Sequence, residues 1–411
     1  MLKARRLSRI VETKSSSLFR SIFLPHEWTK SFKNLINAGN FIVALPFSWV
    51  PGWRISQYTS GRLKSVEKTW RIIFITFFIS CSTLDLFYRG HYSIYCDYSS
   101  MENKEIMETN LDLISRLGCT ILSWDIFQRR DKHVAFVNHL LISYERFETR
   151  KRNFGGYERQ RNPGMYLYLV IAFPTSVIFP VVGSLGAYLQ ARNSGRFWGS
   201  RLIPPRIYNS YPGIVCYSLY ELCIVYSNVY NLLFFSAIAI MYATLTVNYV
   251  RDLISRVRFT PGKYIRSYQG LQILNAYNLE ILSKYMWPSA QNIILLCHVC
   301  INVILVLTHK SLPWGIFGMM LAGFIMISLF EHNCIKKNAQ LYEESKRLIE
   351  IVSITKNCRQ MKVAKSLQPL KVYMGSFYFF KMRTFMTYLA TVVDYTITVL
   401  VTIRFYRPAR R

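Results

Sequence analysis

Charged residues are scarce in this sequence of 411 residues, and acidic residues are scarcer than basic ones. Asp, Glu, Lys and Arg make up only 18% of the chain, whereas a soluble globular domain usually has about a quarter. The 51 Lys and Arg against 22 Asp and Glu give a formal net charge of +29. Such an excess is typical either of a nucleic-acid-binding protein or of a membrane protein with basic cytoplasmic loops. The positions of the charges therefore decide between these two classes.

The sequence also has little that indicates chemistry at a metal, a cofactor or a nucleophile. Its nine cysteines are an odd number without the spacing of a disulfide framework. Cys297, His298 and Cys300 are neighbours on one predicted helix and could not all face one ion, and His133 and His139 lack zinc-site spacing. No nucleophile and base stand in a recognisable arrangement. We therefore expect no enzymatic activity, no cofactor and no metal.

Long apolar runs are what the sequence does have. Seven of them approach the ~20 residues that a helix needs to cross a bilayer. The fourth run is longer, and its helix of about 51 Å would project beyond the ~30 Å hydrocarbon core. A shorter run at 41–50 contains Pro46 and is expected to form a helix at the membrane interface. The sequence thus predicts an all-α membrane protein with seven transmembrane helices, at residues 70–87, 111–127, 165–189, 214–247, 293–308, 312–330 and 384–403.

The basic residues fall mainly on one side of these predicted helices. Of the 51 Lys and Arg, 36 precede the first helix or follow the second, fourth or sixth, and 11 lie on the opposite side. Because basic loops remain in the cytoplasm, we expect a cytoplasmic N-terminus and an extracellular C-terminus. Anionic lipids of the inner leaflet account for the positive charge, so membrane lipids are expected as partners and nucleic acid is not.

A polar stripe follows one face of the last predicted helix. Its six members are spaced three or four residues apart and lie within about 80° of each other around the helix axis. An ionisable group in mid-membrane is costly, which favours a function for Asp394. We expect the stripe to line a water-filled pore in which carboxylates favour cations. Alternatively, the threonines bond to backbone carbonyls and Asp394 pairs with another helix. The stripe consists of Thr384, Thr387, Thr391, Asp394, Thr398 and Thr402.

The same helix carries a short motif: Thr387-Tyr388, five residues, then Asp394-Tyr395. It resembles the Thr-Tyr, five hydrophobic residues, Gln-Phe signature in the last helix of arthropod gustatory receptors. The preceding residues 365–370 and 374–377 are similar to the approach to that helix in gustatory and odorant receptors. The Thr-Tyr pair favours the gustatory branch. Asp394 and Tyr395 replace the Gln and Phe of the signature, a change that bears on ion selectivity and gating.

The resemblance implies a tetrameric, ligand-gated, non-selective cation channel in the plasma membrane of chemosensory neurons. It would open on binding an extracellular tastant or odorant, as a homotetramer or as a heterotetramer with a co-receptor. One last helix from each subunit would line the pore. A cytoplasmic anchor would be built from the ends of helices four to seven, which suits the long fourth helix and the polar, helix-compatible residues 336–371. The alternative is a seven-helix receptor that signals through a cytoplasmic partner without its own pore, and a transporter comes third.

A second polar face lies near the predicted outer end of the fourth helix. It combines aromatic rings, a carboxylate and an amide, a mixture typical of small-molecule pockets. The resemblance also places ligands in the outer half of the helix bundle. Glu221 could accept hydrogen bonds from an amine or a sugar hydroxyl, and equally these side chains could bond to neighbouring helices. The candidate ligand-binding residues are Tyr217, Tyr220, Glu221 and Asn228, with Tyr188, Trp314 and Phe317 as further walls.

These expectations divide the chain into four parts. Residues 1–69 are a cytoplasmic segment with the interfacial helix, and residues 70–335 hold helices one to six with the outer ligand pocket. Residues 336–378 are the cytoplasmic anchor helix region. Residues 379–411 are the pore-lining helix and an extracellular tail.

Overall fold

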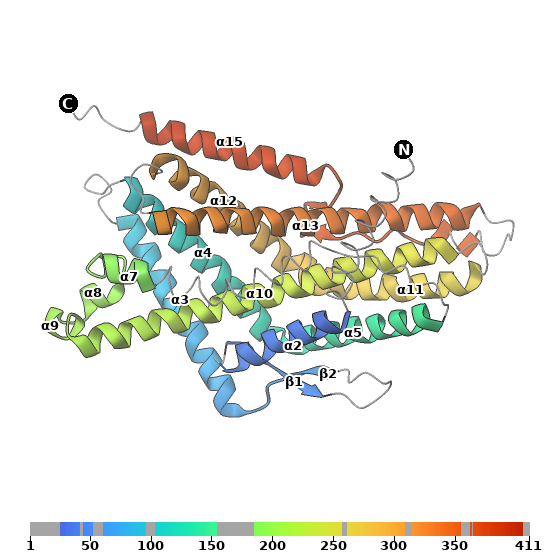
Figure 1. Cartoon of the computed structure of the whole chain (residues 1–411), viewed down its shortest axis with the longest axis horizontal. Helices are drawn as coiled ribbons and strands as arrows, with labels where there is room; N and C mark the ends of the chain where they lie inside the picture. The colour runs from blue at the N-terminus through green and yellow to red at the C-terminus, as the bar shows by residue number, and fades with distance from the viewer. Residues whose placement is uncertain are drawn as a thin grey trace, which may run out of the picture.

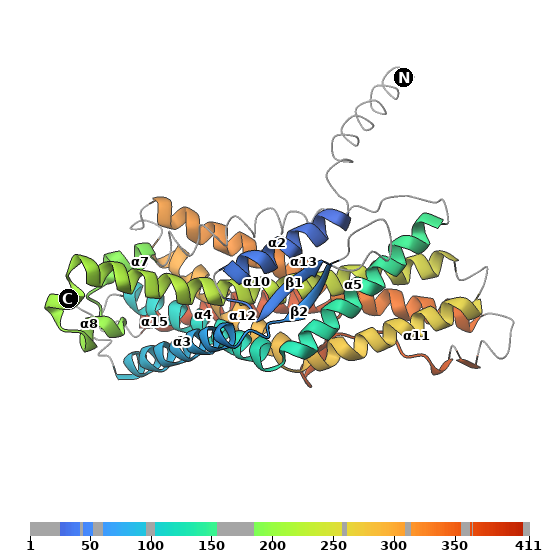
Figure 2. The same ribbon diagram turned by 90° about the horizontal axis from the view of Figure 1, so that it is seen from below.

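The computed structural model describes residues 25–41, 44–51, 61–95, 103–153, 185–256, 261–308, 314–354, 362–363 and 365–405. The protein is elongated, and its long helices run roughly along one axis (Figures 1 and 2). In its first half lie α2 (Pro25–Phe41), β1 (Phe47–Pro51), β2 (Gly61–Ser65), α3 (Thr69–Tyr95), α4 (Asn103–Gln128) and α5 (Arg130–Asn153). Then follow α7 (Leu185–Ala191), α8 (Trp198–Leu202), α9 (Pro205–Tyr208), α10 (Tyr211–Arg256), α11 (Pro261–Asn278), the π-helix η3 (Leu279–Met286), α12 (Trp287–Thr308), α13 (Trp314–Ser353), β3 (Tyr373–Met374), β4 (Tyr378–Phe379) and α15 (Thr384–Phe405).

Four helical segments are long and apolar enough to cross a membrane: Thr69–Tyr95, Tyr211–Ser255, Ile265–Leu307 and Thr384–Ile403. They contain the first, fourth, fifth and seventh predicted runs. The second run lies in α4 and the sixth begins α13, so both are also helical. The third run, 165–189, lies outside the described residues except for its last five, which begin α7. The all-α membrane fold is therefore confirmed.

Helix length separates two regions of the molecule. The 22 residues of α15 make about 33 Å of helix, close to the thickness of a bilayer core. The 46 residues of α10 make about 69 Å and the 40 residues of α13 about 60 Å. Both extend past the start of α15 and lie beside α11 and α5 at the right of Figure 1. This region corresponds in position to the expected anchor.

The core of the molecule is built around α10. Phe234 of this helix stacks on Phe47 with ring centroids 4.6 Å apart and lies 6.1 Å from the ring of Phe32 in α2. All three rings are buried. The expected interfacial helix at 41–50 is therefore wrong, because α2 ends at Phe41 and Phe47–Pro51 is a strand paired antiparallel with β2. Ala44, Leu45 and Phe47 are buried against the rest of the protein. Pro46 and Pro51 interrupt a helix at this point.

One polar side chain of α5 helps to dock the strand pair. Asn138 accepts a hydrogen bond from the backbone N–H of Leu63 and donates one to its carbonyl, each at 2.9 Å. An amide side chain can replace a strand neighbour in this way because it has both a donor and an acceptor. The N-terminal segment is thereby fixed to the helices that extend past α15.

The expected anchor helix region, 336–378, is only partly helical. The helix α13 continues without interruption from the sixth run to Ser353, so the first half of this region is helical. The second half does not continue it, because Tyr373–Met374 and Tyr378–Phe379 pair as a short antiparallel hairpin directly before α15. Gly375 turns this hairpin with φ of 59°, a left-handed conformation that glycine adopts without strain.

A proline explains how the hairpin is held. In the π-helix, the N–H of Trp287 donates to the carbonyl of Leu282, five residues earlier. The same spacing would pair the carbonyl of Ser283 with residue 288, but Pro288 has no N–H. The N–H of Gly375 donates to that carbonyl instead, at 2.8 Å. The missing donor thus docks the segment that precedes α15 onto the start of α12.

Candidate functional site

The last helix, α15, lies at the periphery of the bundle and packs on α12 and α13 along one face (Figure 1). Tyr388 and Val392 are buried in this face. The hydroxyl of Tyr388 is 3.1 Å from Nδ1 of His298, and Asn302 donates to the hydroxyl of Thr396 at 3.5 Å. Aliphatic and aromatic side chains complete the packing: Phe385, Leu389, Val399, Leu400 and Ile403.

The polar stripe predicted from the sequence does not lie in this packed face. Thr387, Asp394, Thr398 and Thr402 are exposed, and Thr384 and Thr391 are half-buried. Four of the hydroxyls donate to the carbonyl four residues earlier, for example Thr398 to Asp394 at 2.8 Å and Thr391 to Thr387 at 2.9 Å. The threonines therefore bond to the backbone and remain exposed at the same time. Their hydrogens point inward, so their oxygen lone pairs are what the stripe presents.

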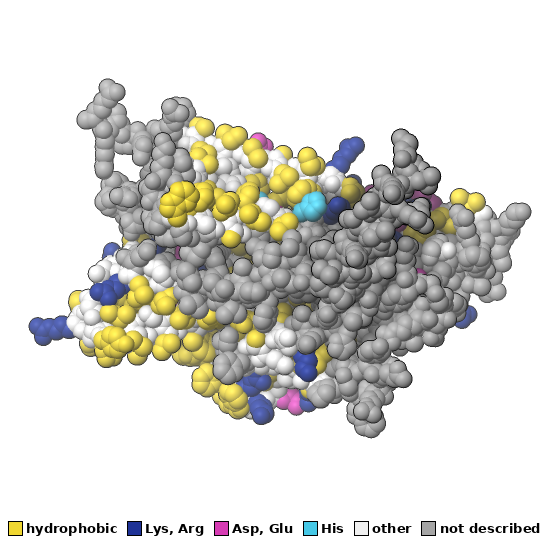
Figure 3. All heavy atoms as spheres, in the orientation of Figure 1, with side chains coloured by type: hydrophobic (Ala, Val, Ile, Leu, Met, Phe, Trp, Pro, Cys, Tyr) yellow, Lys and Arg dark blue, Asp and Glu magenta, His cyan; other side chains and the backbone are white. Residues whose placement is uncertain are grey.

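A third face of α15 is apolar and also exposed. It consists of Met386, Val393, Ile397 and Val401, each with about half or more of its surface accessible. At about 100° per residue, the packed, apolar and polar faces are centred roughly 120° apart. Figure 3 shows hydrophobic side chains gathered over this helix at the top of the molecule. A helix with these three faces fits a position between its own subunit, lipid and water.

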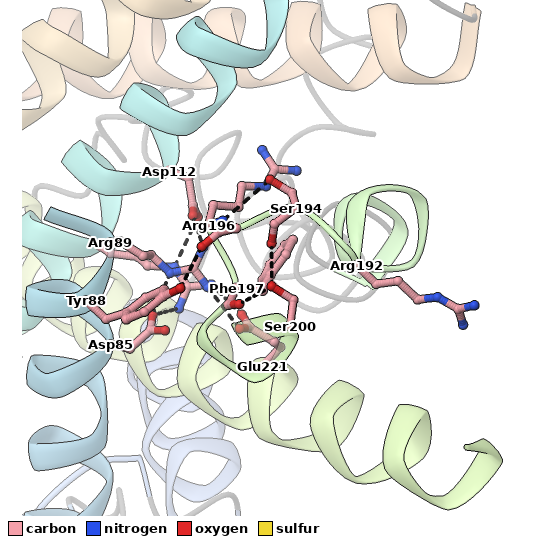
Figure 4. A network of polar contacts seen from close by, with 12 residues as sticks. Asp85, Tyr88, Arg89, Asp112, Arg192, Ser194, Arg196, Phe197, Ser200 and Glu221 are labelled. Carbon is pink, nitrogen blue, oxygen red and sulfur yellow. Dashed lines mark hydrogen bonds and ion pairs between the residues drawn. The ribbon is translucent and has the colours of Figure 1, made fainter. Parts of the chain in front are cut away.

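Five charged side chains meet at the other candidate site, and we name them the charge cluster: Asp85, Arg89, Asp112, Arg116 and Glu221 (Figure 4). They come from α3, α4 and α10. Each of the two guanidinium groups contacts all three carboxylates. Arg89 reaches Glu221 at 2.9 Å, and Arg116 reaches it at 2.5 Å. The cluster joins three helices through charge-assisted hydrogen bonds, which are the strong kind.

The charge cluster is buried and carries an uneven charge. The side chains of Asp85, Arg89, Arg116 and Glu221 are between 0% and 6% exposed. Three carboxylates against two guanidinium groups leave these five side chains with a formal charge of −1, and the buried Arg196 lies near Asp112 with a further positive charge. Oδ1 of Asp85 has no hydrogen-bond partner among the described residues. Breaking a buried network of this kind leaves an uncompensated charge and is strongly destabilising.

Aromatic rings surround the cluster. Tyr188, Phe197, Tyr208 and Tyr217 form a separate buried group, with Trp198 and Tyr220 packed against it. Tyr188 stacks on Tyr217 with centroids 5.0 Å apart. The guanidinium of Arg89 lies 5.0 Å from the centroid of Phe197. The segment between α7 and α8 is fixed here as well, because the hydroxyl of Tyr88 donates to the carbonyl of Gly195 at 2.7 Å.

The structure brings some of the predicted ligand-binding residues together and not others. Tyr188, Tyr217 and Tyr220 lie in one aromatic group. Glu221 is next to them but is engaged by two arginines, and Asn228 donates to Ser82 at 3.5 Å farther along α10. Trp314 is exposed and contacts Phe317 with centroids 6.3 Å apart. No described contact joins Trp314 or Phe317 to the tyrosines.

Sequence reasoning missed most of the charge cluster, although a signal was present. Asp85 and Arg89 are four residues apart, and so are Asp112 and Arg116. An acid followed four residues later by a base is the spacing of a helical ion pair. Both pairs stand in apolar helices, where unpaired charges are costly. The spacing predicts two pairs, but only the packing of the helices shows that they merge around Glu221.

The arrangement of these helices matches that of proteins of known structure. The chain has the fold of insect olfactory receptors, which is the fold that the resemblance implied. The solved structures similar to it include insect olfactory receptor OR5 from Machilis hrabei, in complex with eugenol and without it. Both have a TM-score of 0.60 and 10% identity, and they match over 92% and 91% of this chain and 98% of the OR5 chain. No family model and no curated protein matches the sequence.

Proposed function

We propose that this chain is a subunit of a ligand-gated, non-selective cation channel of the gustatory and odorant receptor superfamily, with the gustatory branch favoured. In this proposal several copies, four by analogy with the family, surround a central pore in the plasma membrane of a chemosensory neuron. The assembly is a homotetramer or includes a co-receptor subunit. An extracellular tastant or odorant opens the pore. The fold shared with an olfactory receptor solved with eugenol supports a small-molecule ligand.

The polar face of α15 is the observation that carries this proposal. The helix is the right length to cross a bilayer, and only 11% of the residues in its apolar stretch are buried against the rest of the chain. Its exposed apolar face suits lipid, but Thr387, Asp394 and Thr398 do not, because polar groups in hydrocarbon are costly. Only water or another subunit can meet that face. A shared aqueous pore supplies both.

The chemistry of the polar face favours cations. The threonine hydroxyls donate to backbone carbonyls, so their oxygens are free to accept and to coordinate. A carboxylate stands in the middle of the helix at Asp394, and Coulomb attraction adds to the oxygen lone pairs. Rings of oxygens and carboxylates are how cation pores replace part of the hydration shell of an ion.

The ligand would act at the end of the bundle where α15 terminates. The charge cluster and its aromatic neighbours lie at that end, beside α7 and α8 at the left of Figure 1. A ligand shifts a closed–open equilibrium only if it binds the open arrangement better. The cluster joins α3, α4 and α10, and α12 packs on α4 and carries α15. Helix rearrangement around a ligand can thus be transmitted to the pore helix.

Ion permeation tests the proposal. Purified protein in planar bilayers is expected to pass cation current, and Asp394→Asn is expected to assemble normally and to lose part of its cation-over-anion preference. The matched control is Asp131→Asn, the same change at an exposed aspartate at the start of α5. Unchanged selectivity in Asp394→Asn would remove that residue from the pore. No current from the wild type under any condition would instead favour a receptor that acts through a cytoplasmic partner.

A further inference from the structure

A small buried polar cluster lies beneath α15, and we name it the hook: His298 of α12, Glu331 of α13 and Tyr388 of α15. All three are buried, with His298 2% and Glu331 1% exposed. Nδ1 of His298 is 3.1 Å from the hydroxyl of Tyr388 and 3.9 Å from Oε2 of Glu331. The hook thus links α15 to α12 and α13, the two helices on which it packs.

The members of the hook are held from behind by further polar contacts. Gln291 donates to Oε1 of Glu331 at 3.1 Å, and Nε2 of His298 lies 3.5 Å from the hydroxyl of Ser328. The ring of Phe324 packs edge-on against the imidazole, with centroids 4.9 Å apart. These contacts satisfy the imidazole and Oε1 of Glu331, which fixes the position and orientation of the ring, while Oε2 of Glu331 has no hydrogen-bond partner among the described residues. The imidazole in turn presents Nδ1 to α15.

The hook adds directional contacts to an interface in which the other cross-helix hydrogen bond, from Asn302 to Thr396, is long at 3.5 Å. The other contacts of the packed face are mostly between apolar side chains, which set the coarse rotation of the helix by burying one face but can repack after a small rotation. A hydrogen bond weakens steeply with angle, so the bond to Tyr388 defines that rotation. Thr387 is the adjacent residue, about 100° away on the polar stripe. Fixing Tyr388 therefore fixes the direction in which the stripe points.

We infer that His298 and Glu331 are positioning residues that set the rotation of α15, through Tyr388, and thereby aim Asp394 and the threonine stripe. This inference rests on the proposed function, because the stripe must face water for its direction to matter. It concerns the orientation of the helix rather than its folding. A net hydrogen bond changes an equilibrium about fivefold, which sets the size of the expected effects.

Hydrogen–deuterium exchange tests whether the hook holds the helix, independently of any current. Tyr388→Phe removes only the hydroxyl, and His298→Leu removes the imidazole. Each is expected to speed amide exchange in α15 about fivefold, while the double variant is no faster than either single one. His298→Gln, which keeps a hydrogen-bonding group, is expected to restore protection. The matched control Tyr285→Phe, at a half-exposed tyrosine outside α15, is expected to change nothing there.

Cysteine labelling tests whether the hook aims the stripe. In detergent-solubilised protein, a water-soluble thiol reagent is expected to modify Thr398→Cys much faster than Ile397→Cys. Ile397 directly precedes Thr398 in the sequence but lies on the apolar face. Adding Tyr388→Phe is expected to reduce that contrast about fivefold. An unchanged contrast, or additive exchange effects of the two single variants, would overturn the inference. Equal labelling of both cysteines in the parent protein would instead refute the aqueous pore, while the exchange experiment would still decide whether the hook exists.

Discussion

Replacing Arg116 by methionine removes one of the two guanidinium groups of the charge cluster and keeps an unbranched, apolar stem in its place. Oδ2 of Asp85, Oδ1 of Asp112 and Oε2 of Glu221 each lose a donor, at distances of 2.7, 3.1 and 2.5 Å. The formal charge of the cluster changes from −1 to −2. Because Asp85 and Glu221 are buried, water cannot replace their lost donors, whereas Asp112 is 32% exposed. Removing one partner of a buried ion pair costs about 3–5 kcal/mol, and we expect Arg116→Met to lose that much free energy of unfolding.

The assay is the temperature at which purified protein in detergent loses its monodisperse size-exclusion peak. If the entropy of unfolding scales with chain length as in soluble domains, 3–5 kcal/mol lowers the midpoint by roughly 3–6 °C. The control is Lys346→Met, which breaks an exposed pair with Glu350 at the same four-residue spacing, 3.9 Å apart. Such surface pairs contribute about 0–1 kcal/mol. Equal midpoints for the two variants would refute the view that the cluster stabilises the bundle.

A compensating change separates charge from packing. Adding Asp112→Asn to Arg116→Met returns the cluster to a formal charge of −1, because one acid and one base have been neutralised. If electrostatics dominates, the double variant is more stable than Arg116→Met alone, although both changes remove contacts. A double variant that is less stable still would show that packing and hydrogen-bond geometry outweigh net charge.

Three further predictions follow from single residues. Cysteines placed along α15 should react with aqueous reagents faster at Thr398 than at Val393, and equal rates would place both faces in the same environment. Gly375→Ala should destabilise the hairpin by about 1–2 kcal/mol, seen as faster amide exchange at Gly375 and its neighbours, because φ is 59° and the added Cβ lies 3.0 Å from Cγ of Pro288. Burial lowers the pKa of His133 despite the nearby Asp125, so the unfolded chain takes up a proton first as the pH falls. The midpoint temperature of unfolding should therefore decrease as the pH falls below about 6.5. His133→Gln should make this decrease shallower, and an unchanged decrease in the variant would contradict the reasoning.

The sequence by itself determined that this is a helical membrane protein and that its last helix carries a polar stripe. Apolar runs and the bias of basic residues follow from the cost of placing charge in hydrocarbon, and this information is local to each segment. The same is true of the stripe from Thr384 to Thr402, which depends only on helical periodicity. Helical pattern alone gave the wrong structure at residues 41–50 and for the hairpin at 373–379, where prolines and the pairing of neighbouring strands decided the structure.

Only the tertiary structure decided which helices meet. Asp85, Arg116 and Glu221 are far apart in the sequence, and nothing local states that α3, α4 and α10 bring them within hydrogen-bonding distance. His298 and Tyr388 are separated by 90 residues, so their contact could not be predicted from local sequence either. The physical reason is that helical periodicity fixes the direction of a side chain around its own axis, whereas the partner it faces is fixed by how whole helices pack.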